Sequence, residues 1–149
     1  MRRFGIIKIS REGIRLVRII QNQEDAAMND YHAKRRKMLA ENVPFSDGKW
    51  NIPYLYEYLV EVNYGTENIA LRFFGHHLEN AELAGILLKE FLLNEDYDGS
   101  ESQLGAAVIL RRMDRRALKA NKELVLLAQK NEAEWKRPCR EDENPDEWL

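Results

Sequence analysis

Residues 103–131 read QLGAAVILRRMDRRALKANKELVLLAQKN, and their small and apolar side chains recur at intervals of four and three residues. That spacing places these side chains on one face of a helix. The helical seam consists of Ala106, Leu110, Met113, Ala117, Ala120, Leu124, Leu127 and Asn131. Ser100 and Gln103 form a capping box in front of it, and Pro138 follows it. The sequence therefore predicts one long helix over residues 100–136.

Such a helix is longer than the domain that has to hold it. About 35 residues at ~1.5 Å each give roughly 53 Å, whereas a compact chain of this length is roughly 40 Å across. We therefore expect the helix to bend, to break or to meet a partner. Two interpretations of the seam stay open. It packs on the chain's own sheet and on the preceding helix, or it contacts another protein through Leu110, Met113, Ala117, Ala120, Leu124 and Leu127.

Four β-rich runs precede this helix and predict two hairpins. The first pairs Phe4–Ile9 with Ile14–Ile20 through a connector that ends in Gly13. The second pairs Tyr54–Tyr64 with Ile69–Phe74 through a short polar turn. Because short turns join antiparallel neighbours, we expect the four strands to form one antiparallel sheet.

Two further helices are predicted after the hairpins. Asn22 is placed to cap a helix that runs to about Ala40, and Asn80 is placed to cap one that runs to about Leu93. Residues 43–52 are predicted to form a loop, because Pro44, Asp47-Gly48 and the following Pro53 are turn signals.

The order ββα-ββα-α predicts an α+β fold, in which an antiparallel sheet of about four strands is packed by helices. We expect one such domain over residues 1–137 and a flexible acidic tail over residues 138–149. Hydrophobic residues make up 44% of the chain and charged residues 32%, which is typical of a soluble globular protein. The lone Cys139 excludes an intramolecular disulfide and a Cys-based zinc site. Because no apolar run is long enough to span a bilayer, no membrane partner and a cytoplasmic location are expected.

The charges are sorted along the chain. Residues 1–40 carry ten Lys/Arg and four Asp/Glu, and residues 41–100 carry three and eleven. Residues 101–122 carry six and two, and residues 123–149 carry four and eight. The total of −2 therefore conceals two basic and two acidic segments. Segregated charge is an indication about partners and not about the fold.

The basic segments suggest a surface for a polyanion. Lysines and arginines with almost no acid among them bind phosphate backbones, without reading sequence. The candidate residues for binding RNA or DNA are Lys34, Arg35, Arg36, Lys37, Arg111, Arg112, Arg115, Arg116, Lys119 and Lys122. The alternative is intramolecular, because the same side chains could neutralise the acidic segments.

Three smaller patterns have structural explanations that compete with functional ones. Tyr54, Tyr56 and Tyr58 share one face of the predicted strand, where they either face the core or form a stacking platform for bases. His76-His77 is the single His cluster near carboxylates, but neighbours on an extended segment point apart and do not share a metal. The acidic turn at residues 94–99 lacks the twelfth ligand of a calcium loop.

No nucleophile, paired catalytic carboxylates or phosphate loop can be named, so the chain is predicted not to be an enzyme and to use no cofactor or metal. We expect a non-enzymatic binding protein that contacts RNA or DNA backbone through basic helix faces. The alternative is a protein–protein interaction or assembly module that uses the helical seam, the acidic middle segment or the tail. In the tail, Trp148 and Leu149 end an acidic stretch and suit a docking peptide.

Overall fold

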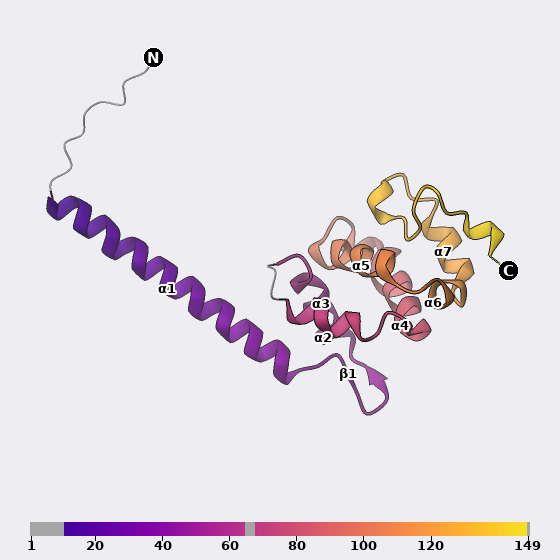
Figure 1. Cartoon of the computed structure of the whole chain (residues 1–149), viewed down its shortest axis with the longest axis horizontal. Coiled ribbons are helices and arrows are strands. Elements are labelled where there is room, and N and C mark those ends of the chain that lie inside the picture. The colour runs from indigo at the N-terminus through magenta and orange to yellow at the C-terminus, as the bar shows by residue number, and fades with distance from the viewer. Residues whose placement is uncertain (1–10, 65–67, 149) are drawn as a thin grey trace, which may run out of the picture. The chain divides into compact units, whose positions relative to one another are not determined.

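The computed structural model describes residues 11–64 and 68–148, which are mostly helical (Figure 1). Helix accounts for 69% of the structure and strand for 3%, in a single two-stranded sheet among the described residues. The predicted sheet of about four strands, and with it the α+β fold class, is therefore wrong. By internal contacts the chain divides into two units, Met1–Met38 and Leu39–Leu149.

The regular elements of the described residues are α-helices, two short strands, a π-helical segment and short 3₁₀ turns. The α-helices and strands are α1 (Arg11–Glu41), β1 (Phe45–Ser46), β2 (Lys49–Trp50), α2 (Ile52–Glu61), α3 (Ile69–Gly75), α4 (Ala81–Ile86), α5 (Glu101–Arg112), α6 (Arg115–Lys119) and α7 (Lys122–Ala128). A π-helical segment, Leu87–Leu92, continues α4. Short 3₁₀ turns cover Glu95–Tyr97, Glu134–Lys136 and Pro145–Glu147.

Helix α1 replaces the predicted first hairpin in the described residues. The strand predicted at Ile14–Ile20 and the helix start predicted at Asn22 are both wrong, because one helix runs through them from Arg11. β-branched residues favour strands only weakly, so their presence in Ile14–Ile20 does not by itself specify a strand. The partner strand, Phe4–Ile9, lies outside the described residues.

Helices α2 and α3 replace the predicted second hairpin. Leu55, Tyr58, Leu59 and Val62 are buried, and their spacing of three, one and three residues is that of one helix face. The Asn51 side chain accepts a hydrogen bond from the backbone N–H of Tyr54 and caps α2. The strand prediction is wrong because Tyr and Val favour strands while the buried positions follow a helical period.

The end of α2 is tied to the start of α3 by one side chain. Asn68 is 3% exposed and accepts hydrogen bonds from the backbone N–H groups of Ala70 and Leu71. Its amide nitrogen donates to the backbone oxygens of Glu61 and Tyr64. One asparagine therefore caps α3 and satisfies carbonyl groups at the C-terminal end of α2.

The row of tyrosines is not one surface in the helix. Tyr58 is 1% exposed, and its hydroxyl donates a 2.5 Å hydrogen bond to the Leu39 carbonyl oxygen. Tyr54 is 36% exposed, and Tyr56 lies 5.6 Å from Tyr97, measured between ring centroids. The three rings therefore point in different directions and do not form a common platform.

The segment predicted as a loop contains the small sheet. Phe45 pairs with Trp50 and Ser46 with Lys49 in antiparallel register. Asp47 and Gly48 form the turn with φ of 53° and 73°. Two successive residues with positive φ define the type I′ turn that joins two-residue hairpins, and Asp-Gly is a preferred sequence for it.

The C-terminal unit is held together by α5 packing on α2 and on the π-helical segment. Gly105 of α5 lies so close to α2 that an added Cβ would be 2.0 Å from the Leu59 carbonyl oxygen. The Gln103 side chain, 1% exposed, donates to the carbonyl oxygens of Phe91 and Leu92 at 3.2 and 3.1 Å. A glycine and a buried glutamine thus fix α5 against its neighbours.

Two predicted helix starts are confirmed. Asn80 caps α4 through a hydrogen bond from the backbone N–H of Leu83. Ser100 caps α5 through a hydrogen bond from the backbone N–H of Gln103, whose own side-chain oxygen accepts from Gly99. Both were predictable because a capping side chain and its target lie within three or four residues of each other.

The long helix predicted over residues 100–136 breaks into α5, α6 and α7. At the first break the backbone N–H of Asp114 donates to the Leu78 carbonyl oxygen, and the Asp114 side chain caps α6. At the second break the Asn121 side chain donates to the carbonyl oxygens of Ala81 and Ala117. Each break therefore coincides with a hydrogen bond to a carbonyl group distant in sequence, that of Leu78 or of Ala81.

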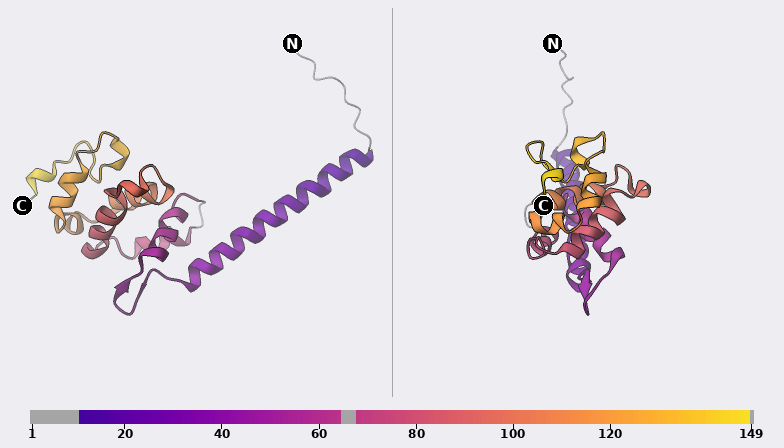
Figure 2. Two further views of the ribbon diagram at one scale, coloured as in Figure 1. Left: turned by 180° about the vertical axis from the view of Figure 1, so that it is seen from behind. Right: turned by 90° about the vertical axis from the view of Figure 1, so that its right-hand side faces the viewer.

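The segment after α7 folds back over the same unit (Figure 2). Cys139 is 2% exposed, and Pro145 is buried in a turn that contacts α7. The ammonium group of Lys122 donates a 2.9 Å hydrogen bond to the Trp148 carbonyl oxygen. The tail as far as Trp148 is therefore docked on the helices in this structure.

Substituting Gly105 with alanine is expected to lower the free energy of unfolding by ~2–3 kcal/mol. The new methyl group meets the backbone of Leu59, which cannot rotate away, so α2 and α5 have to separate. Gly75→Ala is the matched control, because an added Cβ there meets nothing within 4 Å. Urea denaturation of both variants measures the difference. Equal stabilities would contradict the close approach of the two helices.

Candidate functional site

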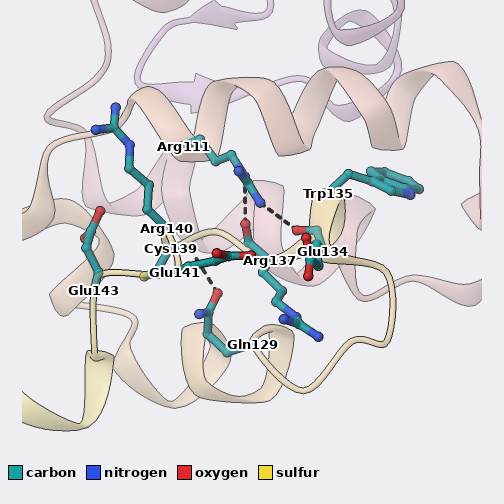
Figure 3. Close-up of a pocket in the computed structure, with 9 residues that line it drawn as sticks. All are labelled: Arg111, Gln129, Glu134, Trp135, Arg137, Cys139, Arg140, Glu141 and Glu143. Atoms are coloured by element: carbon teal, nitrogen blue, oxygen red, sulfur yellow. Dashed lines mark hydrogen bonds between the residues drawn. The ribbon is translucent and has the colours of Figure 1, made fainter.

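The predicted basic surface on α5–α7 is largely engaged within its own unit. Arg111 donates from Nε to the Arg137 carbonyl oxygen at 2.9 Å and from Nη2 to the Glu134 carbonyl oxygen at 2.6 Å. These bonds hold the loop after α7 against α5 (Figure 3). Arg111 is therefore occupied as a structural clamp.

The acidic tail supplies partners for two more basic residues. Arg115 forms an ion pair with Glu143, with an Nε–Oε2 distance of 2.5 Å and an Nη2–Oε1 distance of 2.6 Å. The side chains are 38% and 22% exposed, so solvent screens this pair only in part. Lys122 binds the backbone of Trp148, as described above. The last basic and last acidic segments thus meet in the fold.

Arg116 is paired at the start of α6. It forms an ion pair with Asp114 at 3.1 Å and a longer one with Glu79 at 3.7 Å. The side-chain hydrogen bond from Arg116 lowers the pKa of Asp114 below its ordinary value, and the same bond raises the pKa of Arg116. Arg112 and Lys119 remain exposed. The accessible part of this basic segment therefore consists of Arg112, Lys119 and the exposed side of Arg116.

The other predicted basic cluster belongs to the N-terminal unit. Lys34, Arg36 and Lys37 are exposed on α1, and Arg35 is half-buried. Lys34 forms an ion pair with Asp30 at 3.0 Å, one helical turn earlier. The side chains of Lys34 and Asp30 are 77% and 64% exposed, so this ion pair contributes little to stability.

The predicted partner-binding seam is divided between the core and the surface of its unit. Leu110, Met113 and Ala117 are between 0% and 3% exposed. Leu124 and Trp148 are half-buried, whereas Ala120 is exposed and Leu127 is 53% exposed; Leu149 lies outside the described residues. From Leu110 to Ala117 the seam therefore packs within its own unit. It packs among helices and not on the four-stranded sheet that the first interpretation also named.

A cavity of about 730 Å³ is lined by residues of the C-terminal half (Figure 3). Burial raises the pKa of the Cys139 thiol to about 11, with Glu143 adding to that effect and Arg115 opposing it. At neutral pH the thiol stays protonated and is a poor nucleophile. The lining residues are Arg111, Gln129, Glu134, Trp135, Arg137, Cys139, Arg140, Glu141 and Glu143. Their guanidinium groups and carboxylates mix both signs, so the cavity selects no charge.

Ring packing accounts for His77, and an ion pair engages the acidic turn. His77 lies 4.6 Å from Phe73 and 5.3 Å from Trp50 between ring centroids, whereas His76 is exposed. Asp98 of the acidic turn pairs with Lys136. Across residues 11–64 and 68–148, no group of three or more His, Cys, Asp or Glu side chains could hold a metal ion.

The exposed apolar side of α1 is a surface that the sequence analysis missed. Ile14, Val17, Met28 and Tyr31 are 43%, 56%, 58% and 59% exposed. Leu39 is the only buried residue of this helix. The available signal was the helical spacing of these residues, which the β-branched character of Ile14–Ile20 concealed.

Comparison of the chain with protein-family models, with curated proteins and with solved structures finds no match. No helix in the described part of the chain is long and apolar enough to cross a membrane.

Removing the Arg115–Glu143 ion pair is expected to loosen the tail and expose Cys139. In Glu143→Gln the rate of thiol labelling by a disulfide reagent should rise severalfold, because a lost partly buried ion pair costs about 1 kcal/mol of opening free energy. Glu141→Gln, the same change at an exposed tail position, is the control. If both variants are labelled at the wild-type rate, the ion pair does not hold the tail.

Stability is expected to fall as the pH drops through the ordinary range of a histidine. Burial and then the neighbouring His76 lower the pKa of His77 below 6.5, so the unfolded chain binds that proton more readily. Protonation therefore favours unfolding as the pH falls from about 7 to 5.5. His77→Gln should flatten this decrease, whereas His32→Gln, at an exposed position on α1, should not. Chemical denaturation over that pH range measures both, and an unchanged slope in His77→Gln would contradict the assignment.

Proposed function

We propose that this chain is a non-enzymatic protein–protein interaction module whose docking element is α1. The observation that carries the proposal is the exposure of its apolar side chains. Seven large apolar residues of α1 are at least 43% exposed: Ile14, Leu16, Val17, Ile19, Ile20, Met28 and Tyr31. Five of them lie within Ile14–Ile20, and exposed apolar residues gathered in this way mark interaction sites in soluble proteins.

The energetics of a helix support the same proposal. Helices in proteins draw most of their stability from packing an amphipathic face, and a helix without such packing is marginal in water. The 31 residues of α1 include one buried side chain, that of Leu39 at its C-terminal end. A partner that covers the apolar side of α1 would supply the missing packing free energy.

A photo-crosslinking amino acid placed at Val17 or at Arg15 tests this proposal in cells. Two positions along a helix differ by ~200°, so these side chains point to nearly opposite sides. We expect an adduct of defined mass from position 17 and none from position 15. The mass of the adduct identifies whether a second copy or a different protein is bound. Absence of any adduct from position 17 would overturn the docking role of α1.

A second candidate function, binding to RNA or DNA backbone, is favoured by Lys34, Arg36 and Lys37. They are exposed on a single helix, and no acid interrupts the run. Changing Lys34 and Arg36 to Glu should weaken the binding of mixed-sequence RNA or DNA and reduce its salt dependence. Changing Arg72 and Lys89 to Glu is the charge-matched control and should weaken binding less, because both are exposed and lie outside the predicted basic surface. An electrophoretic mobility shift titration at low salt measures this, and absence of binding by the wild type would exclude this candidate.

A further inference from the structure

The apolar side of α1 contains a regular seam. Residues 14, 17, 21, 24, 28 and 31 alternate at spacings of three and four and are Ile, Val, Gln, Glu, Met and Tyr. Each of them is exposed. This spacing is that of the a and d positions of a coiled coil, extended over about two and a half heptads. A partner helix is the element that fits such a seam.

The charges on α1 are arranged in blocks of alternating sign. Arg11, Arg15 and Arg18 occupy its first third, with Glu12 as the one acid. Glu24, Asp25 and Asp30 occupy the middle, where there is no Lys or Arg. Lys34–Lys37 follow. A parallel pair in register would place each block against its own sign, whereas an antiparallel pair can place the basic first block against the acidic middle.

We propose that α1 pairs with α1 of a second copy as an antiparallel coiled coil over Ile14–Tyr31. This inference rests on the proposed docking role of α1 and names its partner. In this register Ile14 faces the partner's Tyr31, and Val17 faces the partner's Met28. Gln21 and the partner's Glu24 meet near the centre. The two-fold symmetry repeats each of these contacts, as expected for an isologous dimer.

The charged flanking positions fit the same register. With Ile14 at position a, Arg18 and Asp25 both occupy position e. In antiparallel coiled coils e positions lie opposite e positions of the other helix, so Arg18 faces the partner's Asp25, and symmetry forms this pair twice. Both side chains are exposed on α1. Charge complementarity at this position therefore selects a second copy in the antiparallel direction.

The centre of the seam limits the strength of the pairing. Gln21 and Glu24 are polar residues at core positions, and polar core residues fix the register at a cost in affinity. With only Ile14, Val17, Met28 and Tyr31 contributing apolar area from each helix, the dimer is a reversible one. Its population therefore depends on protein concentration.

A charge exchange on the full chain tests the inference. We expect Arg18→Glu and Asp25→Arg each to raise the dimer dissociation constant roughly tenfold, since each turns two attractive pairs into repulsive ones. The double variant Arg18→Glu/Asp25→Arg should return to within about threefold of the wild type. Arg15→Glu, at an outward-facing b position, carries the same charge change and should have little effect. Sedimentation equilibrium at protein concentrations up to about 1 mM measures all five proteins.

The outcomes separate this inference from the docking role on which it rests. A wild-type monomer throughout that range, or single variants that are not rescued by the double one, would overturn pairing with a second copy. If position 17 then crosslinks to a different protein, α1 is still a docking element and only its partner has been misassigned. If position 17 gives no adduct, both proposals fail. Rescue in the double variant supports the antiparallel dimer, because an unrelated partner could not restore the exchanged pair.

Discussion

The close approach of α5 to α2 is the constraint on which the C-terminal unit depends. Gly105 lies against the Leu59 carbonyl oxygen at a distance that leaves no room for a side chain. That contact brings Gln103 within reach of the last carbonyl groups of the π-helical segment. It also sets the position of Arg111, which lies further along α5 and whose guanidinium group binds the loop after α7. One helix contact thus determines where the returning chain can dock.

The sorted charges have a structural explanation in this unit. The last acidic segment folds back onto the basic segment before it, and Arg115 meets Glu143, 28 residues later. Arg116 is paired with Asp114 and Glu79. Because neighbouring blocks of opposite sign can neutralise each other after a short reversal of the chain, their segregation alone does not indicate an external polyanion. Arg111 and Lys122 bind backbone carbonyl groups instead, and Arg112 and Lys119 are exposed.

The parts of the fold that could be predicted from the sequence are those set by local chemistry. Asn80 and Ser100 begin helices because each side chain caps a backbone N–H three residues away. The turn between β1 and β2 also has a local signal, the pair Asp47-Gly48, from which the sequence analysis predicted only a loop. The break at Asp114 has no such signal, because it depends on the carbonyl group of Leu78, which is distant in sequence. The strand predictions failed where Tyr, Val and Ile favoured strands and the buried positions followed a helical period.

The candidate site likewise contains features that could be predicted from the sequence and features that could not. Ion pairing between Arg115 and Glu143 could not be predicted, because Arg115 begins α6 whereas Glu143 follows α7 and a loop, so nothing local relates the two residues. The seam of α1 could have been found from spacing alone, since Ile14, Val17, Met28 and Tyr31 already show it in the sequence.

The two units also use their apolar residues differently, and this difference is the argument for assigning the interaction to α1. In the C-terminal unit, three residues of the helical seam, Leu110, Met113 and Ala117, are buried in the unit's own core. These buried residues have no hydrophobic free energy left to give to a partner. The seam of α1 retains that free energy, since its apolar members are exposed. Its polar centre and alternating charge blocks then restrict the partners that can use it, because a partner has to match both the spacing and the sign at each turn.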